Sequence, residues 1–311
     1  MISTNLDWVV IFLIQMKIGI LGNASLLCFY TFTLITGQNL RPTDQILNQL
    51  VLANCLALVS KGIPQEMAAF GLEYFLDGTG CKLIYYLHRV SRGVSLSTTC
   101  LLGGFQAVNI CSRSSWWREL RIRIPSCIGL CCSFCWILNL LVNIHVAIRV
   151  KGPVTHKNRS LENMPKFSCS KTTTDKLSSS LIAGMIFFVD YILLGLMVWA
   201  SGSMVFVLYR HKQRVQHIHS KSQSHQPSHE ARATCTILIL VSSFVLFYSL
   251  SSVLTLHVAL SVIPAQWLLN TSVFVALCFP TLSPVVLITR DPRVSKLWLA
   301  CWSRCFFLNA E

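Results

Sequence analysis

A cluster of basic side chains stands inside one of the apolar stretches of the sequence. His88, Arg89 and Arg92 fall within little more than one helical turn, and Ser95 follows on the same side. His88 and Arg92 are four positions apart, so a helix places both on one face. Guanidinium and imidazole groups are strong donors to carboxylates, sulfates and other acceptors. We expect these four residues to line a cavity for an anionic or hydrogen-bond-accepting ligand.

Glu66, in the preceding apolar stretch, admits a second interpretation of the same cluster. An ionisable group inside a membrane is costly and is expected to be paired or functional. Glu66 therefore belongs either to the ligand pocket or to an internal ion pair that neutralises Arg89 and Arg92. The sequence leaves both interpretations open, and both can hold in different conformations.

The elements that carry these residues are predicted to be membrane-spanning helices. Of the 311 residues 53% are hydrophobic and only 12% are charged, whereas soluble domains carry about 25% charged residues. A spanning helix needs ~20 mostly apolar residues. The stretches that meet this length are 8–34, 45–70, 82–111, 126–148, 178–209, 233–260 and 267–289. We expect an all-α membrane protein, a single seven-helix domain over 1–311.

The distribution of Lys and Arg predicts the orientation of the chain. Connectors 36–44, 112–125 and 210–232, with the tail 290–311, hold fourteen basic residues, and the opposite set holds seven. The basic side is expected to be cytoplasmic, which places the N-terminus outside the cell. The tail is predicted to form a short amphipathic helix on the membrane. The basic connector 210–232 suits an acidic cytoplasmic partner.

The predicted outer surface carries two cysteines and one glycosylation sequon. Cys81 opens the third stretch, and Cys169 lies in the long connector 149–176. They form a disulfide that pins this connector over the helices, or they remain two free thiols. Asn158 begins an Asn-Arg-Ser sequon in the same connector, well clear of the helices. We expect Asn158 to be glycosylated.

Motifs of several other protein classes are missing from the sequence. No Gly-rich phosphate loop, H-E-x-x-H or G-x-S-x-G occurs, and no metal-ligand spacing is present. The net charge of +14 is explained by the cytoplasmic membrane surface rather than by nucleic acid. We therefore expect no enzymatic activity, no cofactor and no nucleic-acid partner.

Several long runs resemble vomeronasal type-1 receptors, a pheromone receptor family. They are KGIPQEMAAF at 61–70, GCKLIYYLHRVSRGVSLSTTCLL from Gly80, FQAV from Phe105, CWILN at 135–139, ASGSMVFVLYRHKQRVQHIHS at 200–220 and FPTLSPVVLITRDPRV at 279–294. The runs are spread from residue 61 to residue 294, and the resemblance extends over nearly the whole chain.

The resemblance implies a rhodopsin-like receptor in the plasma membrane of vomeronasal sensory neurons. Such receptors detect small pheromone-type molecules and couple to a heterotrimeric G protein of the inhibitory type. The family disulfide falls on Cys81 and Cys169, and its glycosylation site on Asn158. The basic residues expected to face the G protein are Arg113, Arg118, Arg210, Lys212 and Arg214.

The chain departs from the wider rhodopsin-like pattern at its activation motifs. The usual D-R-Y is missing, and the usual N-P-x-x-Y appears as Ser283-Pro284-Val285-Val286-Leu287. Asn54 stands where most such receptors carry a sodium-binding Asp. Two alternatives remain, a bitter-taste-type or other chemosensory receptor and a small-molecule membrane transporter. Ligand-dependent GTP exchange favours a receptor, and substrate flux favours the transporter.

Overall fold

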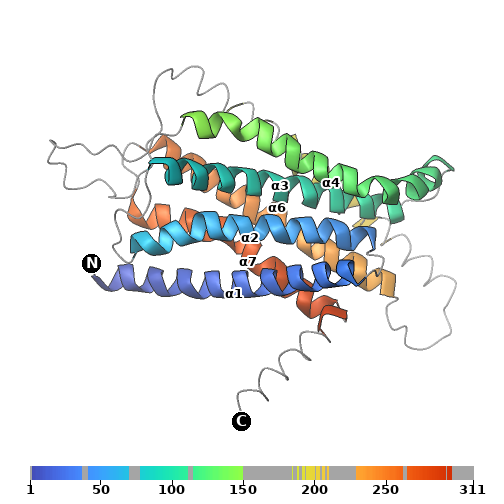
Figure 1. Ribbon diagram of the computed structural model, residues 1–311, viewed down its shortest axis with the longest axis horizontal. Coiled ribbons are helices and arrows are strands. Elements are labelled where there is room, and N and C mark those ends of the chain that lie inside the picture. Colours follow the sequence, from blue (N-terminus) through green and yellow to red (C-terminus); the bar gives the residue numbers. More distant parts are fainter. Residues whose placement is uncertain are drawn as a thin grey trace, which may run out of the picture.

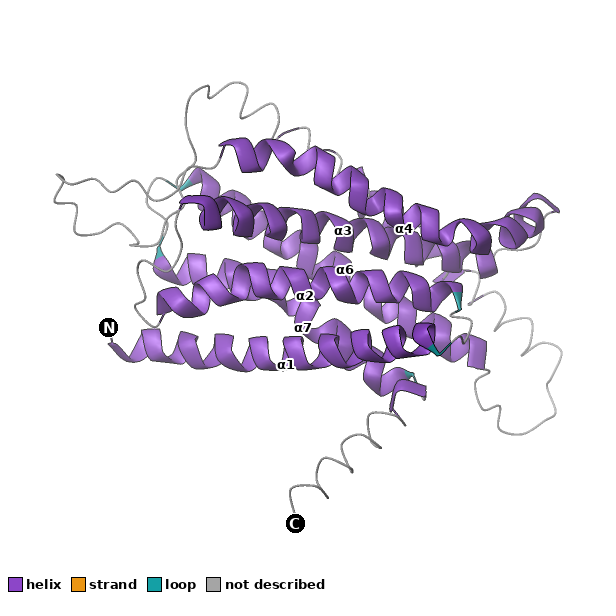
Figure 2. Cartoon of the chain, viewed as in Figure 1, coloured by secondary structure: helices purple, strands orange, loops and turns teal. Residues whose placement is uncertain are grey.

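The architecture was derived from a computed structural model of the chain. It describes residues 2–36, 41–69, 78–110, 115–149, 229–261, 265–291 and 293–295, with scattered positions between 184 and 209. These described residues form helices and no strands (Figure 2). The long helices are α1 Ile2–Ile35, α2 Pro42–Ala69, α3 Gly78–Ile110, α4 Ser115–Arg149, α6 His229–Leu260 and α7 Gln266–Arg290.

The long helices lie side by side along the long axis of the molecule (Figure 1). α2 has a central place, since it contacts α1, α3, α4 and α7. α1 also packs on α7, α3 on α4 and α6, and α6 on α7. The described helices therefore form a bundle in which α2 and α3 contact helices that are distant in the sequence, α7 and α6 respectively.

Among the described residues, five helices are long and apolar enough to cross a membrane. These candidate spans are Asp7–Ile35, Pro42–Met67, Cys127–Ile144, Thr234–Val258 and Gln266–Arg290. α3 is as long as they are, at 33 residues, but Lys82, Arg89 and Arg92 make it less apolar. Of the predicted stretch 178–209, only part is described, and within it Leu194–Ser203 forms a shorter apolar helix. The multi-helix membrane architecture expected from the sequence is therefore confirmed, at the level of five spans.

One helix begins well before the apolar stretch that predicts it. The sequence predicts a connector at 112–125, whereas α4 is helical from Ser115. The intervening run SWWRELRIRI contains three Arg, one Leu and one Glu, which favour helix even where the residues are too polar for the membrane core. In this segment the helix therefore starts before the part that is apolar enough to span a membrane.

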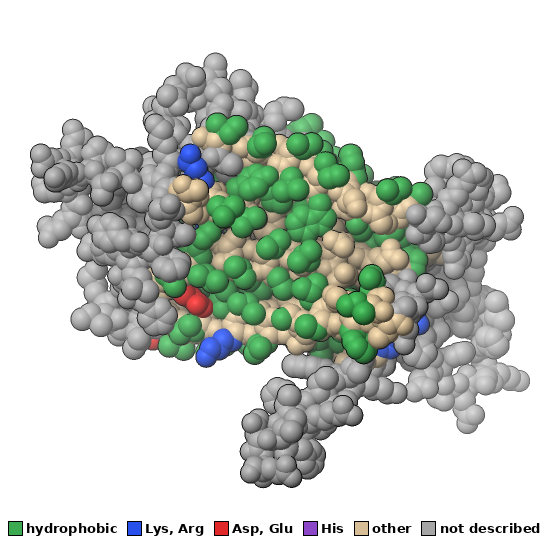
Figure 3. Space-filling view, viewed as in Figure 1, with side chains coloured by type: hydrophobic (Ala, Val, Ile, Leu, Met, Phe, Trp, Pro, Cys, Tyr) green, Lys and Arg blue, Asp and Glu red, His purple; other side chains and the backbone are tan. Residues whose placement is uncertain are grey.

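The outer surface of the bundle is apolar, as lipid contact requires. On the face in Figure 3, hydrophobic side chains cover most of the described surface, and the few charged ones lie towards its edges. Leu130, Phe134 and Leu141 on α4 are 62–73% exposed. Exposed apolar patches of this extent are rare on soluble monomers. The exposed side chains identify α4 as a peripheral, lipid-facing helix.

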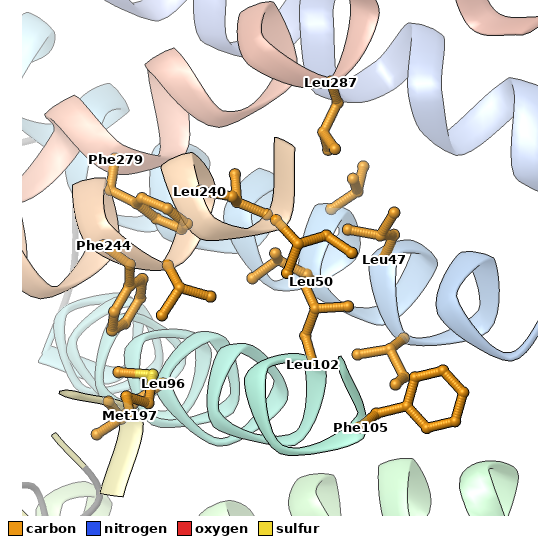
Figure 4. Close-up of a cluster of buried hydrophobic side chains, with 14 of the residues drawn as sticks. Leu47, Leu50, Leu96, Leu102, Phe105, Met197, Leu240, Phe244, Phe279 and Leu287 are labelled. Carbon is orange, nitrogen blue, oxygen red and sulfur yellow. The ribbon is translucent and has the colours of Figure 1, made fainter. Parts of the chain in front are cut away.

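The main hydrophobic cluster of the core receives side chains from every long helix. Figure 4 shows side chains of α2, α3, α6 and α7 pointing into the space between these helices, together with Met197. Leu50, Leu96, Leu102 and Leu240 have no exposed surface. This packing fixes the positions from which polar groups reach the bundle interior.

Candidate ligand-binding site

A small cavity lies between α2, α3, α6 and α7. Its volume, counted as the space open to the centres of water molecules, is about 40 Å³, which holds roughly three waters. It is lined by Ala57, His88, Arg92, Ser95, Phe244, Phe247, Tyr248, Ser251, Ala276, Phe279 and Pro280. His88, Arg92 and Ser95 share one face of α3 because they are spaced by four and three residues. They form the polar wall of the cavity.

The guanidinium of Arg92 bridges α3 to α6. Its Nη2 donates a hydrogen bond to Ser252 Oγ at 2.9 Å, and its Cζ lies 4.2 Å from the centroid of the Tyr248 ring. Ser252 and Tyr248 are both buried, at 6% and 7% exposure. Within the described parts of the chain, Arg92 makes no salt bridge to a carboxylate. A guanidinium has five N–H donors, so Arg92 retains capacity for a further acceptor.

Two other basic side chains lie close to Arg92. Lys61 on α2 lies within electrostatic range of both His88 and Arg92. The Nδ1 atom of His88 is buried and has no hydrogen-bond partner among the described residues. Two basic residues of α3 therefore line one wall of the cavity, and Lys61 of α2 lies near them without lining it.

Glu66 does not neutralise this basic group. No described residue forms a salt bridge with Glu66, and its Oε1 is buried without a described partner. Neither Glu66 nor Arg89 lines the cavity. Of the two interpretations of the cluster, the internal ion pair with Glu66 is absent from this arrangement.

A chain of hydrogen bonds leads from the cavity to α7. Ser95 Oγ donates to Asn54 Oδ1 at 3.1 Å, and Asn54 Nδ2 donates to Ser283 Oγ at 2.9 Å. All three residues are at most 5% exposed. A neutral carboxamide offers both a donor and an acceptor, so Asn54 joins two hydroxyls without a buried charge. Asn54 thereby connects α2, α3 and α7.

The remaining wall of the cavity is aromatic. Phe244 of α6 meets Phe279 of α7 edge-on, with ring centroids 4.6 Å apart, and stacks on Tyr248 at 5.3 Å. Such pairs contribute about 0.5–1.5 kcal/mol beyond the buried area. The cavity is thus amphipathic, with basic and hydroxyl groups opposite aromatic rings.

Several predicted site residues lie outside the described residues. Cys81 is buried and disulfide-bonded, and the other described cysteines are free thiols. Cys169, Asn158, Arg113, Arg210, Lys212 and Arg214 are not described, and Arg118 is described only as part of the helix α4. Their predicted roles stay predictions.

The α6 side of the cavity was not predicted from the sequence. Phe244, Phe247, Tyr248 and Ser251 recur every three or four residues, which is the period of one helical face. The same spacing is typical of ordinary core packing, so it did not single them out. Their place in the cavity lining became evident only from the structure, in which Tyr248 also lies under the Arg92 guanidinium.

Comparisons with known proteins agree with this architecture. The model of the vomeronasal organ pheromone receptor family matches residues 7–300. Vomeronasal type-1 receptor 1 of Homo sapiens is 53% identical over 293 residues, covering 94% of this chain and 82% of the relative. Vomeronasal type-1 receptor 4 of Homo sapiens is 47% identical over 290 residues, covering 93% and 96%. Olfactory receptor class A-like protein 1 of Danio rerio is 29% identical over 296 residues, covering 93% and 90%.

The apolar helix bundle defines a multi-pass membrane protein. With a family match over nearly the whole chain, the protein belongs to the vomeronasal organ pheromone receptor family. Members of this family are chemosensory G-protein-coupled receptors rather than enzymes. The resemblance seen in the sequence is therefore confirmed.

Proposed function

We propose that this receptor binds a small amphipathic molecule in the cavity and activates a heterotrimeric G protein of the inhibitory type. The receptor acts in the plasma membrane, crosses it seven times and keeps its N-terminus outside. The observation that carries the proposal is Arg92, a basic side chain in an aromatic cavity with no carboxylate partner among the described residues. A guanidinium so placed favours a ligand that supplies the missing acceptor.

The ligand is expected to combine an acceptor group with an apolar body. His88 and Arg92 contribute N–H donors at one wall, with Lys61 nearby, and Phe244 and Phe279 contribute apolar surface at the other. A volume of about 40 Å³ is too small for such a molecule. Binding therefore requires the aromatic side chains to change rotamer, as interface side chains commonly do.

Two connections carry the effect of binding away from the cavity. Arg92 links α3 to Ser252 on α6, so an acceptor on the ligand competes directly with an α6 contact. Ser95 links the same wall through Asn54 to Ser283 on α7. A ligand that engages Arg92 and Ser95 thus perturbs α6, which begins on the proposed cytoplasmic side, and α7, which ends there.

The basic residues Arg113, Arg118, Arg210, Lys212 and Arg214 are proposed to form the G-protein-facing surface. On the opposite side, Cys169 is proposed as the disulfide partner of Cys81, and Asn158 as the glycosylation site. Support comes from the positive-inside distribution of Lys and Arg and from the bonded state of Cys81.

The test is a ligand panel read by GTP exchange in membranes of transfected cells. A steroid sulfate and its neutral parent steroid serve as the matched pair of probes. The Arg92→Ala variant is expected to lose response to the sulfate more than to the parent steroid, whereas Arg89→Ala, which removes the same charge outside the cavity, has a smaller effect. Equal losses for both probes in Arg92→Ala at normal surface expression would refute the ligand role. Substrate flux without GTP exchange would identify a transporter instead.

A further inference from the structure

Arg293 is held between two carboxylates where α7 ends beside the start of α2. Its Nη1 and Nη2 donate to Asp44 Oδ2 and Oδ1 at 3.0 and 3.1 Å. Its Nη2 also contacts Asp291 Oδ2 at 3.0 Å. One guanidinium thus joins α2, by two parallel hydrogen bonds, to the chain that leaves α7.

Local sequence explains why both carboxylates stand in place. α2 begins at Pro42, a residue suited to the first helical turn, and Asp44 in that turn interacts favourably with the helix dipole. Asp291 is the C-terminal cap of α7. Its Oδ1 accepts a hydrogen bond from the backbone N–H of Arg293 at 2.9 Å. The Asp291 side chain therefore binds both the backbone N–H and the guanidinium of Arg293.

The ion-paired group of Asp44, Asp291 and Arg293 is partly buried and is flanked by residues of the main hydrophobic cluster. The Asp44 side chain is 6% exposed and the Arg293 side chain 40%. Tyr30 of α1 and Val294, which follows Arg293, belong to the main core cluster at 1% and 5% exposure. Hydrogen bonds to Asp44 raise the pKa of Arg293 above its ordinary value. Bidentate pairs of this kind are stronger and more specific than single contacts.

The three charges do not contribute equally. Without Arg293, Asp44 and Asp291 would face each other with no cation between them, and like charges in proximity repel. Without Asp44, Arg293 would keep Asp291 but lose its hydrogen bonds to α2. Asp44 thus supplies the polar link between the bundle and the chain after α7, beside the packing of Val294 in the core.

We propose that Asp44 and Arg293 are positioning residues, which hold the chain after α7 against the start of α2 in the arrangement from which the receptor activates its G protein. This inference rests on the proposed function, which places this end of the bundle in the cytoplasm. The pair acts on output rather than on ligand binding, because the cavity is lined by other residues, from α2, α3, α6 and α7.

The experiment compares purified receptor variants in lipid vesicles with an inhibitory-type heterotrimer. GTP exchange is measured with and without the steroid sulfate, alongside the thermal unfolding midpoint. Asp44→Asn and Arg293→Ala are expected to lower maximal exchange at least threefold with an unchanged half-maximal probe concentration. Arg41→Ala and Arg290→Ala serve as matched controls, since both side chains are exposed and neither makes a salt bridge to a described residue.

The charge-exchanged double variant Asp44→Arg with Arg293→Asp keeps one cation and two carboxylates together. It is expected to recover at least half of the lost exchange, which a general loss of folding would not allow. Normal maximal exchange in Asp44→Asn, or a loss that the exchanged pair does not restore, would overturn the inference.

If wild-type receptor gives no exchange with any probe, the proposed function fails instead. The unfolding midpoint then still tests the contact, since both single variants should lower it and the double variant Asp44→Asn with Arg293→Ala should lower it no further. If the two substitutions lower the unfolding midpoint additively, the inferred contact between Asp44 and Arg293 is overturned independently of signalling.

Discussion

Ser252→Ala is expected to make the receptor more sensitive to an anionic ligand. The Ser252 hydroxyl accepts a hydrogen bond from Arg92 Nη2 at 2.9 Å and is 6% exposed. A ligand acceptor that reaches Arg92 has to compete with this hydroxyl. Removing the hydroxyl while the guanidinium remains therefore favours the ligand, although a contact seen in the structure has been deleted.

The magnitude follows from the type of hydrogen bond. A hydrogen bond to a charged group contributes about 1.5–3 kcal/mol, but the five donors of Arg92 let a ligand bind while part of the Ser252 bond is kept. If roughly 1 kcal/mol of that bond is given up on binding, its removal improves affinity about fivefold. Arg92→Ala removes the ligand contact itself, so it weakens binding roughly 10- to 150-fold. Substitutions at the two ends of one hydrogen bond thus have opposite effects.

The assay is the half-maximal concentration of the steroid sulfate for GTP exchange, measured at matched surface expression. The neutral parent steroid is the ligand control, because a molecule without an anionic group competes less for Arg92. Ser243→Ala is the matched protein control, since its hydroxyl lies on the same helix and donates to the carbonyl of Leu240 at 2.8 Å. It is expected to leave both half-maximal concentrations unchanged.

A loss of sensitivity to the sulfate in Ser252→Ala would refute the competition argument. It would mean that Ser252 positions Arg92 for the ligand rather than competing with the ligand. An equal gain for both steroids would assign the effect to looser packing of α6.

Two further substitutions test the interior of the bundle. Asn54→Ala is expected to lower the free energy of unfolding by about 2–3 kcal/mol, since the buried hydroxyls of Ser95 and Ser283 lose their partner; thermal unfolding in detergent measures this change. Gly93→Ala places a methyl group against the side chain of Asn139 on α4, which is held by Ser97 at 3.2 Å, so it should lower the unfolding midpoint and surface expression.

Each of these predictions has an internal comparison. Gly104→Ala lies on the same helix with no atom within 4 Å of the added methyl, so it should stabilise α3 by about 0.5–1 kcal/mol. Lowered midpoints in both glycine variants would contradict the packing argument. Asn54→Gln should lower the unfolding midpoint less than Asn54→Ala only if the longer amide still reaches both hydroxyls. An unchanged midpoint in Asn54→Ala would show that the hydrogen-bond chain adds nothing to stability.

The helices, the family and the polar face of α3 could be predicted from the sequence. Apolar stretches of about 20 residues identify membrane helices because the bilayer leaves backbone groups no other way to be hydrogen-bonded. Local spacing also placed His88, Arg92 and Ser95 on one face. α3 is less apolar than the other long helices, and α4 starts early at Ser115, because both helices include polar side chains. A search for apolar stretches does not detect such helical residues.

Partners across the bundle were beyond prediction, because they depend on how the helices are rotated and packed. Glu66 was an obvious counter-charge for Arg92, yet Arg92 meets Ser252 and the Tyr248 ring, 160 and 156 positions along the chain. The join between Asp44 and Arg293 spans 249 positions and has no signature in either local sequence. Sequence alone indicated which stretches are apolar enough to enter the membrane, since the length and hydropathy of a stretch are local properties. Tertiary structure decided which of them meet, because each contact depends on the packing of several helices at once.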